Sequence, residues 1–159
     1  MSRRSFGGLA AVSAASLAVV ALPASAGAVS PPHARTAAAG ASVGLRSTAL
    51  GKILVNSRGH TLYAFSKDSP NRDRCVAIAG CIDIWPMLAT SGKPHAGAGV
   101  KGSQLSTITI AGGRHQVTYA GHPLYTYSAD SGPGQTDYVG AMQFGGTWRA
   151  VTAAGSVKG

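Results

Sequence analysis

The stretch GHTLYAFSKDS at residues 59–69 returns as GHPLYTYSADS at residues 121–131. The two copies lie 62 residues apart, and seven of their eleven positions are identical. Extending the comparison to 55–69 and 117–131 adds one further identity, a valine at the first position. A repeat on this scale predicts a fold built from two copies of one supersecondary unit.

Strand signals surround both copies. Short alternating segments, each three to six residues long, are separated by turn sequences rich in glycine. The segments are 52–55, 61–65, 107–110, 115–119, 123–128, 142–144 and 147–151. Such alternation is typical of β-strands, and Gly145-Gly146 is a hairpin signal. Beyond a short helical turn at 81–85, no segment of the folded part needs a helix. We therefore expect a small all-β domain made of two pseudo-symmetric, hairpin-rich repeats.

Each copy carries the pattern Tyr-x-aromatic-x-x-Asp. The motif residues are Tyr63, Phe65 and Asp68 in the first copy and Tyr125, Tyr127 and Asp130 in the second. The two aromatic side chains of a copy face the same side of their strand, and the preceding leucine faces the other. The aromatic faces are interpreted as core, with an exposed stacking platform as the alternative. The aspartates follow the strands as turn-forming residues, with paired acid–base carboxylates as the alternative.

This combination resembles a bacterial family of secreted repeats, described as predicted lipoproteins of unknown function, that carries a Tyr-x4-Asp motif. The segment from Cys75 through Cys81 to Trp85-Pro86 is similar to the family's segment after the first motif. The closing Gly145-Gly146-Thr147-Trp148 also resembles the family pattern. The resemblance covers roughly residues 47–152 and implies a secreted repeat protein, without implying catalytic residues.

Residues 1–26 read as a signal peptide. Arg3 and Arg4 precede a mildly apolar stretch and the small-residue cleavage site Ala24-Ser25-Ala26. The flanking sequence also matches the core of a twin-arginine signal. We expect a flexible linker at 27–46, the β domain at 47–153 and a tail at 154–159, with no transmembrane segment in the mature chain. The expected location is extracytoplasmic, either secreted or associated with the cell envelope.

Cys75 and Cys81 are the two cysteines of the chain. An even number of cysteines in an exported protein favours a disulfide, with a redox-active or metal-binding dithiol as the alternative. His60 and His122 occupy matched positions in the two copies, and they are the candidate metal ligands if the repeats bring them together.

The chain has 14 Lys and Arg residues against 5 acidic residues, all of them Asp, and a formal net charge of +9. Such an excess favours anionic partners, and we expect a cell-wall polymer or a membrane surface rather than nucleic acid. No nucleophile–base signature, haem attachment motif or phosphate-binding loop is present, so we expect a non-enzymatic binding module without a cofactor. The alternatives are an envelope metal-binding or redox accessory protein and a cell-wall hydrolase that uses Asp68 and Asp130.

Overall fold

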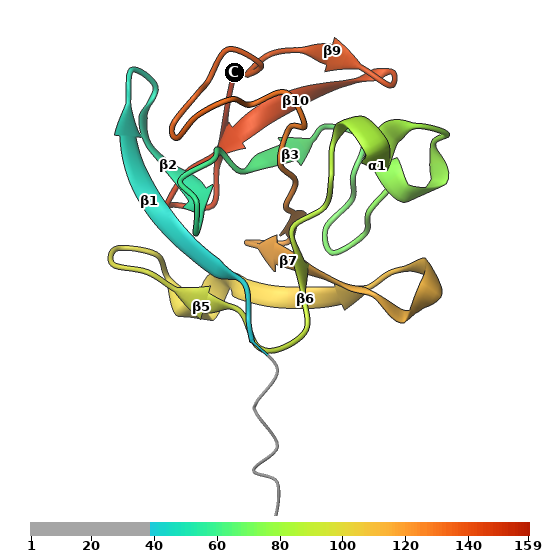
Figure 1. Cartoon of the computed structure of the whole chain (residues 1–159), viewed down its shortest axis with the longest axis horizontal. Helices are drawn as coiled ribbons and strands as arrows, with labels where there is room; N and C mark the ends of the chain where they lie inside the picture. The colour runs from blue at the N-terminus through green and yellow to red at the C-terminus, as the bar shows by residue number, and fades with distance from the viewer. Residues whose placement is uncertain (1–38) are drawn as a thin grey trace, which may run out of the picture. The chain divides into compact units, whose positions relative to one another are not determined.

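The computed structural model describes residues 39–159 as a set of short strands in three small sheets (Figure 1). The predicted signal peptide and most of the predicted linker therefore lie outside the described residues. The strands are β1 (Ser42–Thr48), β2 (Gly51–Asn56), β3 (Tyr63–Phe65), β4 (Ala89–Thr90), β5 (His95–Ala96), β6 (Leu105–Thr109), β7 (His115–Tyr119), β8 (His122–Pro123), β9 (Met142–Gln143), β10 (Gly146–Val151) and β11 (Val157–Lys158). The helical elements are α1 (Cys81–Ile84) and three 3-10 turns, Cys75–Ala77, Gly102–Gln104 and Ala111–Gly113. The expectation of a small all-β domain is confirmed.

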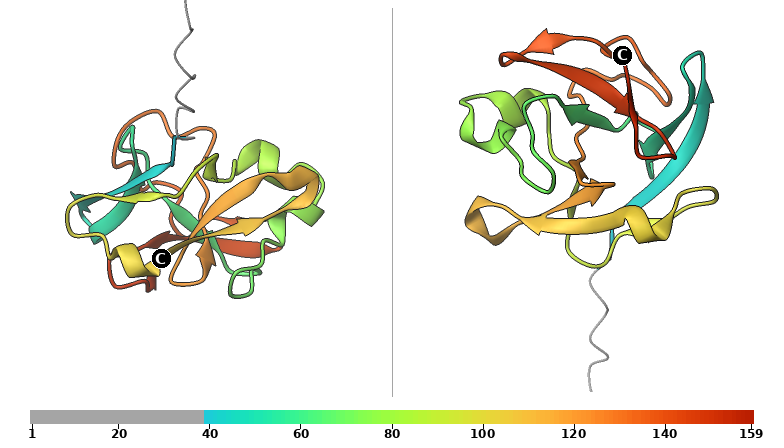
Figure 2. Two further views of the ribbon diagram at one scale, coloured as in Figure 1. Left: turned by 90° about the horizontal axis from the view of Figure 1, so that it is seen from below. Right: turned by 180° about the vertical axis from the view of Figure 1, so that it is seen from behind.

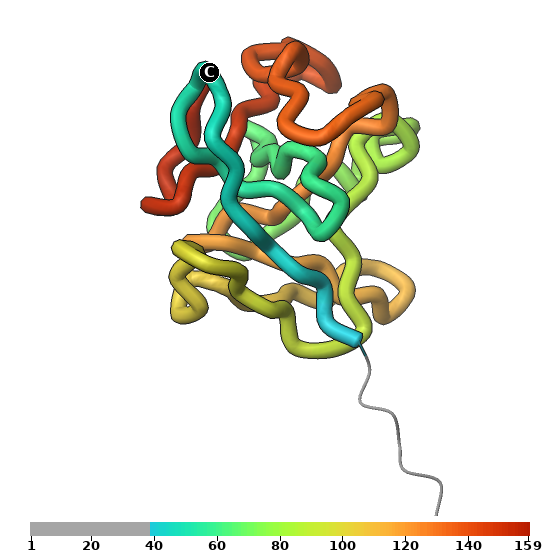
Figure 3. The backbone as a smooth tube through the Cα atoms, turned by 60° about the vertical axis from the view of Figure 1, so that its left-hand side comes forward, coloured from blue at the N-terminus to red at the C-terminus, as the bar shows by residue number. Residues whose placement is uncertain are grey.

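The three sheets have the strand orders β2-β1-β5, β11-β10-β3 with β9 on β10, and β4-β7-β6 with β8 on β7. The views in Figure 2 show the sheet of β6 and β7 at one end of the domain and β9 and β10 at the other. β1 runs along one side between these two ends, as the tube in Figure 3 shows. None of the helices in the described part of the chain is long and apolar enough to cross a membrane.

The folded domain is larger than the predicted range of 47–153. Strand β1 begins at Ser42, inside the predicted linker, and pairs antiparallel with β2. Val43 of this strand is fully buried in the core, which a segment rich in Ala, Gly and Ser does not reveal from its composition. At the other end β11, inside the predicted tail, pairs with β10. The predicted linker and tail boundaries were wrong at these positions.

Two tight turns explain two of the hairpins of the second half. Ala120 and Gly121 both have positive φ, 49° and 84°, and join β7 to β8. Phe144 and Gly145, with φ of 55° and 75°, join β9 to β10. Positive φ at both central residues is the type I′ geometry that fits the twist of paired strands. The predicted hairpin signal was therefore placed one residue late, since Gly146 is already the first residue of β10.

The segment predicted as a strand at 123–128 is a strand only at its start. After β8 the chain continues in isolated backbone contacts instead of a ladder. Tyr125 bridges Tyr63 on one side and Met87 on the other. The amide of Ser128 donates to the carbonyl of Ile84 at 3.0 Å. The second motif is thus held between the first motif and the segment that follows α1.

The core has an aliphatic part and an aromatic part. Leu62 and Leu124 lie in the mainly aliphatic cluster, whose other members include Val43, Leu54 and one aromatic residue, Tyr119. The aromatic cluster consists of Tyr63, Phe65, Cys75, Cys81, Trp85, Tyr125 and Trp148. The alternation of side chains along each repeat strand therefore directs leucine into one cluster and the motif tyrosine into the other.

Candidate functional site

The two motifs meet at a backbone pair between their tyrosines. The amide of Tyr63 donates to the carbonyl of Tyr125 at 2.9 Å, and the amide of Tyr125 donates to the carbonyl of Tyr63 at 3.0 Å. This reciprocal pair is the centre of the pseudo-symmetry that the repeat predicted. Both tyrosine side chains are fully buried, so the interpretation of these aromatic residues as core agrees with their place in the structure.

Each tyrosine hydroxyl reaches the aspartate of the other repeat. The Tyr125 hydroxyl donates to Asp68 Oδ2 at 2.8 Å, and the Tyr63 hydroxyl donates to Asp130 Oδ2 at 3.1 Å. Asp68 also accepts the backbone amide of Arg74 at 2.7 Å, as a turn-forming aspartate would. The motif is therefore completed across the two repeats, and a single copy contains neither pair.

The loops after the aspartates make the same exchange. The amide of Asn71 donates to the carbonyl of Gly121 at 2.7 Å, and the amide of Gly134 donates to the carbonyl of Gly59 at 2.8 Å. A side chain on Gly59 would place its Cβ 2.9 Å from the Cβ of Pro133, so the close approach requires glycine. The Gly-His pair of each repeat thus contacts the loop that follows the motif aspartate of the other repeat.

Burial changes the acidity of both pairs. Burial raises the pKa of Asp68 to about 7, and the hydrogen bonds from Arg74 and Tyr125 oppose that rise. Burial also raises the pKa of Asp130 to about 6, against the hydrogen bond from Tyr63 and the charge of His60. The pKa values of both tyrosines are raised above their ordinary value by burial and by the neighbouring carboxylate. Two carboxyl groups of this domain therefore titrate near neutral pH.

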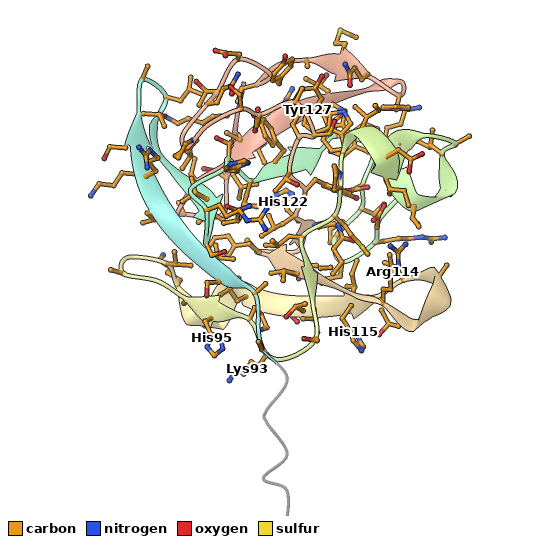
Figure 4. All side chains as sticks on the ribbon, viewed as in Figure 1. Lys93, His95, Arg114, His115, His122 and Tyr127 are labelled. Atoms are coloured by element: carbon orange, nitrogen blue, oxygen red, sulfur yellow. A yellow bond between two sulfur atoms is a disulfide. The ribbon has the colours of Figure 1, made fainter. Side chains whose placement is uncertain are left out.

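An aromatic column crosses the pseudo-symmetry axis. Trp85 and Trp148 stack with their ring centroids 3.9 Å apart and their planes 1° from parallel. Phe65 stacks on Trp148 at 4.4 Å, and Tyr127 packs on Trp85 at 4.4 Å. Tyr127, labelled in Figure 4, is half-buried and packs in turn against the half-buried Tyr138, with ring centroids 3.9 Å apart, so this end of the column lies towards the surface.

The predicted disulfide is present in the aromatic cluster. Cys75 and Cys81 are bonded, with their Cα atoms 5.4 Å apart, and both are fully buried. The bond links the 3-10 turn at Cys75–Ala77 to the first residue of α1, and the amide of Trp85 donates to the carbonyl of Cys81 at 2.8 Å. The disulfide thus fixes the segment that places Trp85 in the aromatic column.

The two candidate metal ligands lie beside different aspartates. His60 acts on the pKa of Asp130, whereas His122 and Asp68 line the same pocket. Within residues 39–159, no group of three or more His, Cys, Asp and Glu side chains is placed to hold a metal ion. The two candidate carboxylates also have different neighbours. Asp73 and Arg74 affect the pKa of Asp68, whereas His60 and Asp137 affect the pKa of Asp130.

A pair of adjoining hollows lies at the end of the domain formed by the sheet of β6 and β7. Their volumes are about 410 and about 610 Å³, and they share Ser91 and His115. Lys93 lines the first hollow and Arg114 the second, together with Thr and Ser hydroxyls. We call these two hollows the basic groove. Figure 4 shows Lys93 and His95 near one another at this end of the domain, and His115 and Arg114 on the side of the turn between β6 and β7.

Sequence reasoning missed the residues of the basic groove. Lys93 precedes β5 and Arg114 precedes β7, and they are 21 positions apart in the chain. No charge cluster in the sequence points to them. Arg149 was also missed, although one signal was available. It follows Trp148 at the position where the first repeat has Pro86 after Trp85, so it marks a place where the two copies differ.

The comparisons with known proteins agree with the two-repeat geometry. A family model described as a secreted repeat of unknown function matches twice, over residues 44–89 and 106–152. The two matches cover one motif each. No curated protein and no solved structure shows a significant match to the chain.

Proposed function

The chain belongs to a family of secreted repeats of unknown function, and on that premise we propose that it is a non-enzymatic binding module outside the cytoplasm. The partner that we propose is an anionic polymer of the cell wall, bound in the basic groove. The known family membership supports the location, and the surface chemistry of the domain supports the partner.

The observation that carries the proposal is that basic side chains line the groove and acidic side chains do not. Lys93, Arg114 and His115 line the basic groove, and all three are exposed. None of the five aspartates of the chain is among the lining residues. Hollowed surfaces lined by charge of one sign concentrate ligands of the opposite sign. The hydroxyls of Ser106 and Thr107 in the first hollow supply hydrogen-bond donors for phosphate or carboxylate oxygens, whereas the hydroxyls of Thr90 and Ser91 already donate to the carbonyls of Gly92 and Ala39.

The shape of the groove suits a chain molecule. The two hollows adjoin through shared residues, so a linear polymer has room for several successive charged units. Contacts of this kind are individually weak and screened by salt, and their sum gives retention on a polymeric surface.

The test is retention of the purified protein on isolated cell wall at low salt and at about 0.5 M salt, where exposed charges are strongly screened. We expect retention at low salt and release at high salt. The variant Lys93→Gln/Arg114→Gln should lose most of this retention. The matched control is Lys52→Gln/Arg58→Gln, which removes the same charge from exposed positions outside the groove.

Equal loss in both double variants would show that net charge, and not the groove, controls retention. No retention of the parent at low salt would remove the proposal altogether.

A further inference from the structure

A second pocket lies beside the Tyr125–Asp68 pair and is separate from the basic groove. Its volume is about 210 Å³, and its walls include the polar side chains of Asp68, His122 and Arg149 and the apolar side chains of Phe65 and Val157. No residue of this pocket lines the basic groove. Figure 4 labels His122 near the centre of the view.

The negative group of this pocket is held in place. Asp68 accepts the Tyr125 hydroxyl on one oxygen and the Arg74 amide on the other, so its carboxyl group is oriented by two partners from different segments. Each carboxylate oxygen can accept more than one hydrogen bond. The Asp68 carboxylate therefore keeps capacity for a further donor that enters the pocket.

The positive group comes from β10. Arg149 lies opposite Ala64 in the pairing of β10 with β3, which places it next to the first motif. Its Nε atom is buried and has no hydrogen-bond partner among residues 39–159. A buried donor without a partner costs free energy, so an acceptor that reaches Arg149 would stabilise this arrangement.

The equivalent place in the other repeat has a different composition. Ser66 donates its amide to the carbonyl of Thr147 at 2.9 Å, as Ser128 does to that of Ile84 at 3.0 Å. These matched bonds make Arg149 the counterpart of Pro86. The twin aspartate, Asp130, therefore has proline at the position that matches Arg149, it is only 6% exposed, and the ionisable neighbours that affect its pKa are His60 and Asp137. The combination of a motif aspartate and an arginine therefore occurs on the Asp68 side.

We propose that this pocket binds a small zwitterion of the amino-acid class, with its ammonium group on Asp68 and its carboxylate on Arg149. A molecule with both charges satisfies both protein groups, whereas an isolated amine or an isolated carboxylate leaves one of them unpaired in a partly buried site. The pocket volume of about 210 Å³ restricts the ligand to small molecules, and alanine is among the smallest zwitterions of the amino-acid class. This inference goes beyond the proposed function.

The experiment is titration calorimetry of the exported protein with alanine, in both enantiomers, against acetate and methylamine. We expect one molecule of alanine per domain, and at least tenfold weaker binding of acetate and of methylamine. Asp68→Asn and Arg149→Gln should each weaken alanine binding at least tenfold. Asp130→Asn is the matched control, because it alters the equivalent carboxyl in the repeat that lacks the arginine, and it should bind alanine as the parent does.

A second readout separates binding from structural damage. Because burial raises the pKa of Asp68 to about 7, a bound ammonium group that favours the carboxylate should release a proton near neutral pH. The apparent enthalpy of alanine binding should then change with the ionisation enthalpy of the buffer in the parent. It should not do so in Asp68→Asn, which has no carboxyl group to titrate at this position.

The inference is overturned if alanine does not bind the parent at millimolar concentration, if acetate or methylamine binds as tightly, or if Arg149→Gln binds alanine unchanged. The groove variant Lys93→Gln/Arg114→Gln should still bind alanine. Its behaviour therefore distinguishes a failure of this inference from a failure of the proposed function.

Discussion

The Tyr125 hydroxyl lies 2.8 Å from the carboxylate of Asp68, whereas its own repeat's aspartate, Asp130, accepts the hydroxyl of Tyr63. The two pairs cross the axis that runs between the tyrosine backbones. Each repeat therefore supplies a donor and an acceptor that it cannot use internally. This exchange explains why the chain contains two copies, because one copy alone would bury a tyrosine hydroxyl without its partner.

The exchange predicts which residues are energetically coupled. In double-mutant cycles that combine Tyr→Phe and Asp→Asn, the pairs Tyr125/Asp68 and Tyr63/Asp130 should show coupling of about 0.5–3 kcal/mol, since these residues are in contact. The same-repeat combinations Tyr63/Asp68 and Tyr125/Asp130 should be additive within about 0.5 kcal/mol. The free energy of unfolding in guanidinium chloride gives all four values. Stronger coupling within a repeat than between repeats would contradict the crossed arrangement.

The raised pKa values predict a dependence of stability on pH. In the folded domain burial raises the pKa of Asp68 to about 7 and that of Asp130 to about 6, from an ordinary value of 3.8. Between the ordinary and the raised pKa the folded state binds more protons than the unfolded state, so the contribution of these groups to stability falls as pH rises from about 4 to about 7. Above the raised pKa values this contribution no longer changes.

The measurement compares the parent with Asp68→Asn and Asp130→Asn between pH 5 and pH 8. Asparagine does not titrate, so each variant should gain stability relative to the parent as pH increases over this range. Using the difference removes the general effect of net charge, which all three proteins share. Curves that stay parallel would show that neither carboxyl titrates abnormally.

The disulfide predicts a sensitivity to reductant. A closed loop as short as that between Cys75 and Cys81 stabilises a domain by about 2 kcal/mol in chain-entropy terms. Reduction should lower the free energy of unfolding by about this amount and leave the domain folded at room temperature. Tryptophan fluorescence follows the change, because the disulfide segment carries Trp85. The variant Cys75→Ser/Cys81→Ser should not respond to reductant, and free thiols in freshly exported protein would contradict the assignment.

The aromatic column predicts a steric requirement at Gly146. A Cβ at this position would lie 2.5 Å from Cε2 of Phe65, whose ring stacks on Trp148 at 4.4 Å. Gly146→Ala should therefore displace Phe65 and destabilise the domain by about 1–3 kcal/mol, the usual cost of overpacking. Gly132→Ala is the control, because nothing lies within 4 Å of its Cβ, and it should change stability by less than about 0.5 kcal/mol. Thermal unfolding of the two variants is a sufficient comparison.

Several elements followed from local sequence and agree with the structure. The predicted strand at 115–119 is β7, and the short helical turn expected at 81–85 is α1 with Trp85 at its end. The leucine and the tyrosine of each motif face opposite sides, as the alternation of a strand requires. These features depend on backbone geometry within a few residues, which is why a sequence pattern is enough to predict them.

Other features depended on segments that are distant in the chain. β3 pairs with β10, more than 80 positions later in the chain. β1 includes residues of a segment that the sequence predicted to be a linker. The repeat predicted two copies of one unit. It did not predict that the Tyr125 hydroxyl would donate a hydrogen bond to Asp68 rather than to Asp130. Nor did it show that Arg149 would join Asp68 and His122 around one pocket.

The difference between the features that the sequence predicted and those that it did not has a physical cause. Composition, the two copies of the motif and the pair of cysteines are properties of the chain before it folds, and they were sufficient for an all-β repeat domain with one disulfide. The choice of partners across the Tyr63–Tyr125 pair, and the placement of Lys93 and Arg114 in adjoining hollows, arise only from tertiary packing. Such contacts are non-local, so their geometry is set by the packing of the whole core and not by any short stretch of residues.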